Sequence, residues 1–302
     1  MLRTLWIAIV AIVPLTHTAA AADTTCNLEE VVRLDAASSS SDFFLLPATF
    51  SGRQTRLVLS LAAWSELRED LVTQLGLKPR RIRTAQFRGV AGDSAKQYVI
   101  VPEFQIGSRT FKDGEFLVAT EDYGAPIAAL GGAFGADRLS YYDVEIDGAT
   151  RAVTLYRPDI YCSGRLVRWS DTWAEIPFKL IDDIPEFQVE VEGKRLKATL
   201  HTGASATLMN LDVARAQFGI TPSSPGVKGL GDQSVSGGNA LTLYAYRFKT
   251  LDVGGLVFND VEVVLGDFVD TDIALGMREL RRLHLYVAFK RKAVYATWAD
   301  SP

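Results

Sequence analysis

The sequence predicts an all-β protein built from two homologous β-barrel lobes with a few short helices. Both halves of the chain contain short stretches of alternating hydrophobic and polar residues that are separated by turns. The two halves also carry the same short motifs in the same order. Of the 302 residues, 48% are hydrophobic and 23% are charged, so the chain has ample material for a core.

The internal repeat consists of six motif pairs, separated by about 140 residues. Each pair is short, but six pairs in one order indicate a duplication. The pattern F-x-D-x-E begins at Phe111 in the first half and at Phe258 in the second. The other pairs are 51–53 with 192–194, 74–77 with 217–220, 89–93 with 228–232, 104–107 with 251–254, and 129–131 with 274–276.

Local patterns place the individual elements. Stretches rich in alternating or β-branched residues predict strands at 98–106, 116–119, 187–191 and 196–200. Turn residues between paired stretches predict hairpins at 144–156 and 287–296. Short helices are expected at 64–75 and 210–218, and Asn210 is a suitable N-cap for the second.

The first 22 residues have the layout of a secretory signal peptide. Arg3 supplies a positive charge, residues 5–15 form an apolar run broken only by Pro14, and small residues lead to Ala22. The apolar run is shorter than a bilayer-spanning helix requires. We therefore expect cleavage after Ala22, export to the periplasm or the medium, and no stable membrane span afterwards. The alternative is a retained membrane anchor.

Removal of the signal peptide leaves 280 residues, which divide into two similar halves. Two cysteines, Cys26 and Cys162, remain in the exported chain. An oxidising compartment favours one disulfide between them, and two unpaired thiols are the alternative. The expected organisation is a signal peptide at 1–22, an N-terminal segment at 23–41, lobe 1 at 42–157, a linker at 158–173, and lobe 2 at 174–298.

Charge and residue inventory exclude several classes of protein. Lys and Arg number 32 and Asp and Glu number 36, which gives a net charge of −4. Nucleic-acid binding needs a clear positive excess, so we expect no nucleic-acid partner. Two cysteines and three histidines leave too few ligands for a zinc finger or an iron–sulfur cluster. We expect no metal and no other cofactor.

The most informative loop is residues 199–205, Thr-Leu-His-Thr-Gly-Ala-Ser, between a predicted strand and a predicted helix. Roughly 70 residues later comes 273–276, Ile-Ala-Leu-Gly. This pattern resembles the aspartic peptidase family of pepsins and retropepsins, and the resemblance covers nearly the whole exported chain, twice. Each lobe of that family carries two apolar residues and Asp-Thr-Gly-Ala/Ser, then a flap hairpin, then two apolar residues and a glycine. The matching residues are Thr202, Gly203, Ala204, Ser205 and Gly276.

The resemblance also shows a departure at both catalytic positions. The family aspartate falls on His201 in the second lobe, and the repeat places Ser60 at the corresponding position of the first. In the first lobe the loop threonine becomes Leu61 and the loop glycine becomes Ala62. The repeat aligns Gly131 with Gly276, so both are expected to be structural glycines.

The resemblance implies a cleft between the lobes that holds an extended peptide or protein segment. Aspartic peptidases share one proton between two carboxylates, and both carboxylates are replaced here. We therefore expect a monomeric pseudo-peptidase that keeps the peptide-binding cleft. One alternative is an active endopeptidase, or another hydrolase, with a non-standard site at Ser60 and His201. Another is a structural or assembly protein whose loops only join the lobes.

Overall fold

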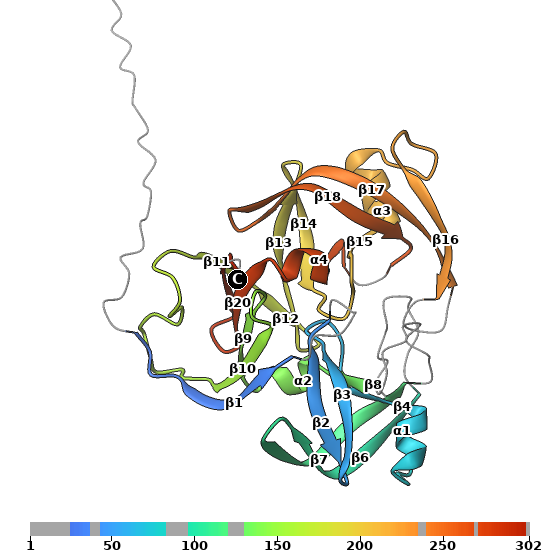
Figure 1. Ribbon diagram of the computed structural model, residues 1–302. Helices are drawn as coiled ribbons and strands as arrows, with labels where there is room; N and C mark the ends of the chain where they lie inside the picture. Colours follow the sequence, from blue (N-terminus) through green and yellow to red (C-terminus); the bar gives the residue numbers. More distant parts are fainter. Residues whose placement is uncertain are drawn as a thin grey trace, which may run out of the picture.

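The computed structural model describes residues 25–36, 43–82, 96–119, 130–234, 240–268 and 271–299. It contains three β-sheets, one in each lobe and one shared by both halves of the chain (Figure 1). The predicted signal peptide lies outside the described residues. Within the described residues, no helix has the length and hydrophobicity needed to cross a membrane.

The first lobe is a seven-stranded sheet with two short helices. Its elements are β2 (Leu45–Phe50), β3 (Arg53–Leu59), β4 (Glu66–Arg68), α1 (Glu69–Gln74), β5 (Arg80–Arg81), β6 (Gln97–Ile106), β7 (Arg109–Ala119), β8 (Leu130–Phe134) and α2 (Ala136–Leu139). The strand order is β2-β3-β8-β4-β7-β6-β5, and β2 pairs with β6 as well. This additional pairing curls the sheet around buried rings of Phe50, Phe104 and Phe116, whose centroids lie 5.0–5.8 Å apart.

The second lobe repeats this arrangement with one additional strand. Its elements are β12 (Lys179–Ile181), β13 (Ile184–Val191), β14 (Lys194–Leu200), β15 (Thr207–Asn210), α3 (Leu211–Phe218), β16 (Lys228–Ser234), β17 (Ala240–Val253), β18 (Leu256–Gly266), β19 (Ile273–Leu275) and α4 (Met277–Leu280). The strand order is β12-β13-β14-β19-β15-β18-β17-β16, and β13 pairs with β17 as β2 does with β6. The two lobes therefore share one topology.

The third sheet joins the two halves. Its strands are β1 (Glu29–Asp35), β9 (Asp143–Asp147), β10 (Ala152–Arg157), β11 (Ala174–Pro177), β20 (Leu283–Ala288) and β21 (Ala293–Trp298). The order β1-β10-β9-β20-β21-β11 is symmetric about the contact between β9 and β20. Both predicted hairpins are confirmed, as β9–β10 and β20–β21. The predicted boundaries assign these hairpins to different lobes, whereas the structure joins them in one sheet.

Equivalent turns of the two lobes have the same backbone conformation. The hairpin turns at 51–52 and 192–193 have φ of 48° and 79° in the first lobe and 47° and 77° in the second. The aspartates of the two F-x-D-x-E motifs, Asp113 and Asp260, also have positive φ, 50° and 54°. Left-handed backbone is uncommon in residues other than glycine. Its recurrence at matched positions agrees with the predicted repeat.

The two predicted helices have different outcomes. The helix predicted at 210–218 is confirmed as α3: the Asn210 side chain accepts a hydrogen bond from the Asp212 N–H at 2.7 Å, and Gly219 ends the helix at φ 69°. The helix predicted at 64–75 is wrong in its first part, where β4 replaces it and only α1 is helical. The reason is tertiary, because β4 pairs with both β7 and β8.

The linker lies against the shared sheet. The disulfide predicted between Cys26 and Cys162 is present and joins residues 136 positions apart. The Trp169 indole stacks on the His284 imidazole with ring centroids 3.7 Å apart and donates a hydrogen bond to Thr297 Oγ1 at 2.9 Å. These contacts fix the connection between the lobes to β20 and β21.

A single hydroxyl bonds the loop of one lobe to the loop of the other. Thr202 Oγ1 accepts a hydrogen bond from the Leu61 N–H at 3.0 Å and donates one to the Leu59 carbonyl at 2.7 Å. All three residues are buried. The bond satisfies two backbone groups of the first lobe that are withdrawn from water.

Removal of the disulfide is expected to destabilise the protein. The Cys26→Ser/Cys162→Ser variant should lose about 2–5 kcal/mol of unfolding free energy, because the cross-link closes a long loop in the unfolded chain. Urea unfolding of the oxidised wild type and the variant measures the difference. Reductant should shift the wild-type midpoint and leave the variant unchanged; equal midpoints without reductant would contradict the prediction.

Removal of the Thr202 hydroxyl is expected to weaken the contact between the lobes. Thr202→Val should cost about 1–3 kcal/mol, because the Leu61 N–H becomes a buried donor without an acceptor. Thr202→Ser keeps the hydroxyl and should recover most of the loss. Thr110→Val, at an exposed position of β7, is the matched control in urea unfolding. A Val variant as stable as wild type would refute the role of the hydroxyl.

Candidate functional site

Ser60 and His201 occupy equivalent positions at the ends of two equivalent strands. Ser60 follows β3, and its N–H donates to the Phe134 carbonyl of β8 at 2.9 Å. His201 follows β14, and its N–H donates to the Leu275 carbonyl of β19 at 2.8 Å. Both strand pairs are parallel. The structure therefore aligns Ser60 with His201, as the repeat in the sequence does.

The two loops continue to match beyond these residues. The Ala63 carbonyl accepts a hydrogen bond from the first residue of α2, and the Ala204 carbonyl accepts one from the first residue of α4, each at 2.8 Å. The Ser205 carbonyl accepts a further bond from the Arg278 N–H at 3.0 Å. In the lobe 1 loop, Leu61 is fully buried and Ala62 is partly exposed. Each loop is thus held against the short helix of its own lobe.

The two loops meet near Ser60. A Cβ atom added to Gly203 would lie 3.8 Å from Ser60 Oγ, an ordinary van der Waals distance. The Thr202 hydroxyl bonds the backbone on both sides of Ser60. The predicted residues Ser60, Leu61, Thr202 and Gly203 are therefore brought together across the lobe interface, and His201 precedes Thr202 directly.

The electrostatic environment of the pair favours neutral groups. Ser60 is only 3% exposed. The His201 side chain is partly exposed, but its Nδ1 is buried without a hydrogen-bond partner, and burial lowers the pKa of the imidazole to about 4. Among the described residues, the Ser60 hydroxyl and the His201 imidazole share no hydrogen bond. At neutral pH the site thus presents a buried hydroxyl and an uncharged imidazole.

Close backbone contact explains the glycine after the last strand of each lobe. A Cβ on Gly276 would lie 2.1 Å from the Ala206 carbonyl oxygen, and one on Gly135 would lie 2.3 Å from the Ser65 nitrogen. Gly135 is therefore the counterpart of Gly276, which corrects the alignment with Gly131 by four residues. Gly131 lies within β8, where an added Cβ would contact the side chains of Thr55 and Leu71.

Two hydroxyl–carboxylate pairs, one buried and one partly buried, support the loops, and they were not predicted from the sequence. In lobe 1, Ser65 Oγ accepts a hydrogen bond from the Gly135 N–H at 2.9 Å and donates to Asp137 at 2.8 Å. In lobe 2, Thr207 Oγ1 accepts from the Gly276 N–H at 3.0 Å and donates to Glu279. Burial raises the pKa of both carboxyl groups. The sequence signal for these pairs is an acidic residue shortly after each glycine: Asp137 follows Gly135, and Glu279 follows Gly276.

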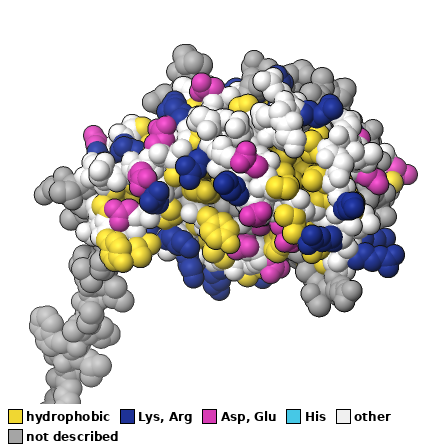
Figure 2. Space-filling view, turned by 90° about the horizontal axis from the view of Figure 1, so that it is seen from below, with side chains coloured by type: hydrophobic (Ala, Val, Ile, Leu, Met, Phe, Trp, Pro, Cys, Tyr) yellow, Lys and Arg dark blue, Asp and Glu magenta, His cyan; other side chains and the backbone are white. Residues whose placement is uncertain are grey.

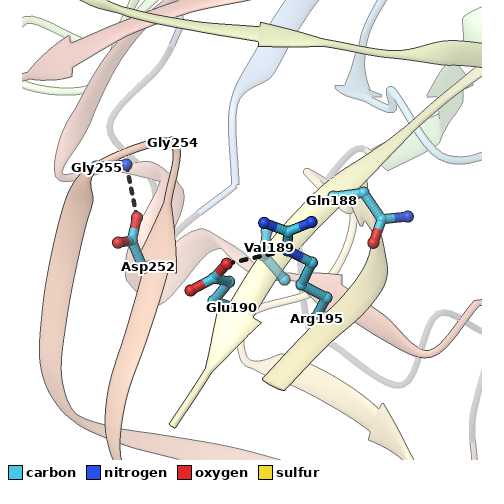
Figure 3. A pocket seen from close by; sticks show the side chains of 7 residues that line it. All are labelled: Gln188, Val189, Glu190, Arg195, Asp252, Gly254 and Gly255. Atoms are coloured by element: carbon cyan, nitrogen blue, oxygen red, sulfur yellow. Dashed lines mark hydrogen bonds and ion pairs between the residues drawn. The ribbon is translucent and has the colours of Figure 1, made fainter. Parts of the chain in front are cut away.

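The structure also shows a small cavity away from these loops. It has a volume of about 300 Å³ and lies at the surface of lobe 2 between β13, β14, β17 and β18 (Figure 3). Its polar groups bond each other: Glu190 pairs with Arg195 at 3.2 Å, and Asp252 accepts the Gly255 N–H at 2.6 Å. Within the described part of the chain, no three His, Cys, Asp or Glu side chains are grouped to hold a metal ion.

The chain is similar to aspartic proteases in part of its sequence and in its fold. Residues 187–278 match the family model for aspartyl proteases. A retropepsin-like aspartic protease from Rickettsia conorii aligns with 44% of this chain and 98% of its own, at 19% identity and a TM-score of 0.34. No curated protein matches the sequence.

A second structural comparison, with the aspartic proteinase from Irpex lacteus, extends over both lobes. It aligns with 85% of this chain and 94% of its own length, at a TM-score of 0.51. Sequence identity is 11%, so the likeness concerns the fold. The chain has the bilobed, mostly β fold of the pepsin-like aspartic proteinases, and its second lobe carries the sequence pattern of the aspartyl protease family.

Proposed function

We propose that this protein is an exported, catalytically inactive relative of the aspartic proteases that binds an extended peptide between its lobes. One observation carries the proposal. Ser60 and His201 occupy equivalent positions at the centre of the two loops, where the family resemblance expects the two aspartates. The supporting loops, glycines and hydroxyl–carboxylate pairs remain in place.

The replaced residues do not supply the chemistry of a proton-sharing carboxylate pair. One carboxylate of such a pair removes a proton from water and the other protonates the scissile group. A serine hydroxyl is no base at neutral pH. The neutral His201 has no acid partner among the described residues. Since each lost acid–base group typically costs a factor of about 10² to 10⁴ in rate, loss of both leaves little hydrolysis.

A serine-nucleophile mechanism has little support from the contacts. The Ser60 hydroxyl is buried and makes no hydrogen bond to His201, whereas an activated serine needs a base within hydrogen-bond reach. A fluorophosphonate probe tests this alternative directly. Labelling at Ser60 that disappears in a His201→Ala variant would replace the binding proposal with a hydrolytic one.

Peptide binding is supported by the intact loop framework. The Thr202 hydroxyl keeps the lobes in contact, and both sheets end in hairpins, β5–β6 and β16–β17. Sheet edges hold extended peptides through backbone hydrogen bonds, without any catalytic group. A protein of this kind would bind peptides and release them unchanged.

The purified protein, residues 23–302, is expected to bind peptides without cleaving them. Incubation with a peptide library from pH 3 to pH 8 should give no new termini by mass spectrometry, while affinity selection from the same library enriches specific sequences. His201→Ala and Ser60→Ala are the matched variants, and both should behave as wild type in cleavage. Cleavage that is lost in His201→Ala would overturn the proposal. Failure to enrich any peptide would favour a purely structural role.

The buried imidazole predicts a pH dependence of stability. The pKa of His201 is about 4 in the folded protein and near its ordinary value of 6.5 when unfolded, so the unfolded chain binds more protons between these values. Stability should fall by about 3 kcal/mol from this group as pH drops from 7 to 4. His201→Gln should remove that part of the slope in urea unfolding. NMR titration of His201 should show no protonation above pH 5.

A further inference from the structure

The edge strand of the first lobe carries unpaired positive charge. Among the described strands, β5 is the last of its sheet and has β6 as its one partner, through Arg80↔Tyr98 and Arg81↔Gln97. Arg80 and Arg81 are exposed, and so are Lys78 before the strand and Lys96 beside it. In the described part of the chain, none of these four side chains forms an ion pair or a hydrogen bond.

The sequence around this edge is basic. The net charge of the whole sequence is −4, yet residues 71–92 contain five Lys or Arg residues and no Asp or Glu. Figure 2 shows acidic and basic side chains interspersed on the face seen from below. The equivalent edge strand of lobe 2, β16, has one lysine and one aspartate, and Asp232 is bonded to Thr242 at 2.5 Å. The positive edge is therefore no part of the repeated framework.

No described strand pairs with the outer edge of β5. In an antiparallel pair, alternate residues point their N–H and C=O groups away from the partner strand, so one residue of β5 faces outward. A further strand can add there by backbone hydrogen bonds. Positive side chains on an edge repel a second copy of the same edge, which would place arginine against arginine. The same repulsion is removed when the incoming strand is acidic.

We infer that β5 binds an extended acidic polypeptide segment, which adds to the sheet of lobe 1 as an edge strand. Arg80 and Arg81 are adjacent in the strand, so their side chains point to opposite faces of the sheet. Directly opposite side chains on paired strands lie about 4.5–5.5 Å apart. The segment is therefore recognised by two neighbouring Asp or Glu residues, one for each arginine. This inference rests on the proposed peptide-binding function and names its class of ligand.

The test compares two labelled, capped octapeptides of Thr and Val that differ only in a central Glu-Glu or Gln-Gln pair. Fluorescence anisotropy should show that wild type binds the Glu-Glu peptide about 3- to 10-fold more tightly, as expected for two exposed ion pairs. Arg80→Gln/Arg81→Gln should abolish the preference. Arg53→Gln/Arg109→Gln removes the same charge from exposed positions of the same lobe and should keep it. The preference should shrink as salt rises from about 0.05 to about 0.5 M.

Each other result has a definite meaning. Equal binding of both peptides to wild type overturns the acidic preference and leaves peptide binding intact. Binding of neither peptide, together with an empty library selection, removes the proposed function as well. N-methylation of the backbone at alternate residues should block binding, and an unaffected Kd would exclude strand addition. Tighter binding to phosphatidylglycerol vesicles than to the Glu-Glu peptide, lost in Arg80→Gln/Arg81→Gln, would assign the edge to a lipid surface instead.

Discussion

The two lobes meet where buried backbone groups must find hydrogen-bond partners. The chain leaves β3 at Leu59 and turns through Ser60 and Leu61 beneath the opposite lobe, where water is excluded. Thr202 supplies the hydroxyl that satisfies both the Leu59 carbonyl and the Leu61 N–H. Leu61, the lobe 1 counterpart of Thr202, has no hydroxyl with which to bond the backbone of lobe 2. Lobe 1 contributes through the Trp64 indole, whose Nε1 donates a hydrogen bond to the Asp182 carbonyl of lobe 2 at 3.1 Å.

The two loops differ in how closely they match the Thr-Gly-Ala-Ser motif, and their contacts account for the difference. The loop 202–205 keeps the sequence Thr-Gly-Ala-Ser, because Thr202 bonds across the interface and Gly203 lies against Ser60. The loop at 61–64 receives those contacts with its backbone and the buried Leu61 side chain, and its Trp64 indole donates a hydrogen bond to the Asp182 carbonyl of lobe 2. The shared sheet joins the same halves independently, and the disulfide ties the N-terminal segment to the linker. The lobe 1 loop thus tolerates Leu-Ala-Ala-Trp without loss of the fold.

Much of the fold could be predicted from the sequence because the repeat is marked by turns. Residues 51–52 and 192–193, and the aspartates 113 and 260, adopt matched conformations that few residues accept. The sequence could not locate Gly135, because residues 129–131 imitate the Ala-Leu-Gly of 274–276 and only the parallel pairing of β3 with β8 distinguishes them. The helix predicted at 64–75 was too long because pairing of β4 with two neighbours overrides local preference.

The site was predictable in its positions and only partly in its chemistry. Ser60 and His201 follow from the repeat, but the burial of Nδ1 and the low pKa of His201 depend on the packing of the folded chain. The acids that do lie near the loops, Asp137 and Glu279, each accept a hydrogen bond from a hydroxyl of their own lobe. The same hydroxyls, of Ser65 and Thr207, accept hydrogen bonds from the backbone N–H groups of Gly135 and Gly276. Carboxylates thus remain in the supporting positions and are absent from the pair at the centre. The supporting carboxylates hold backbone groups through hydroxyls, whereas the central positions carry a hydroxyl and an imidazole.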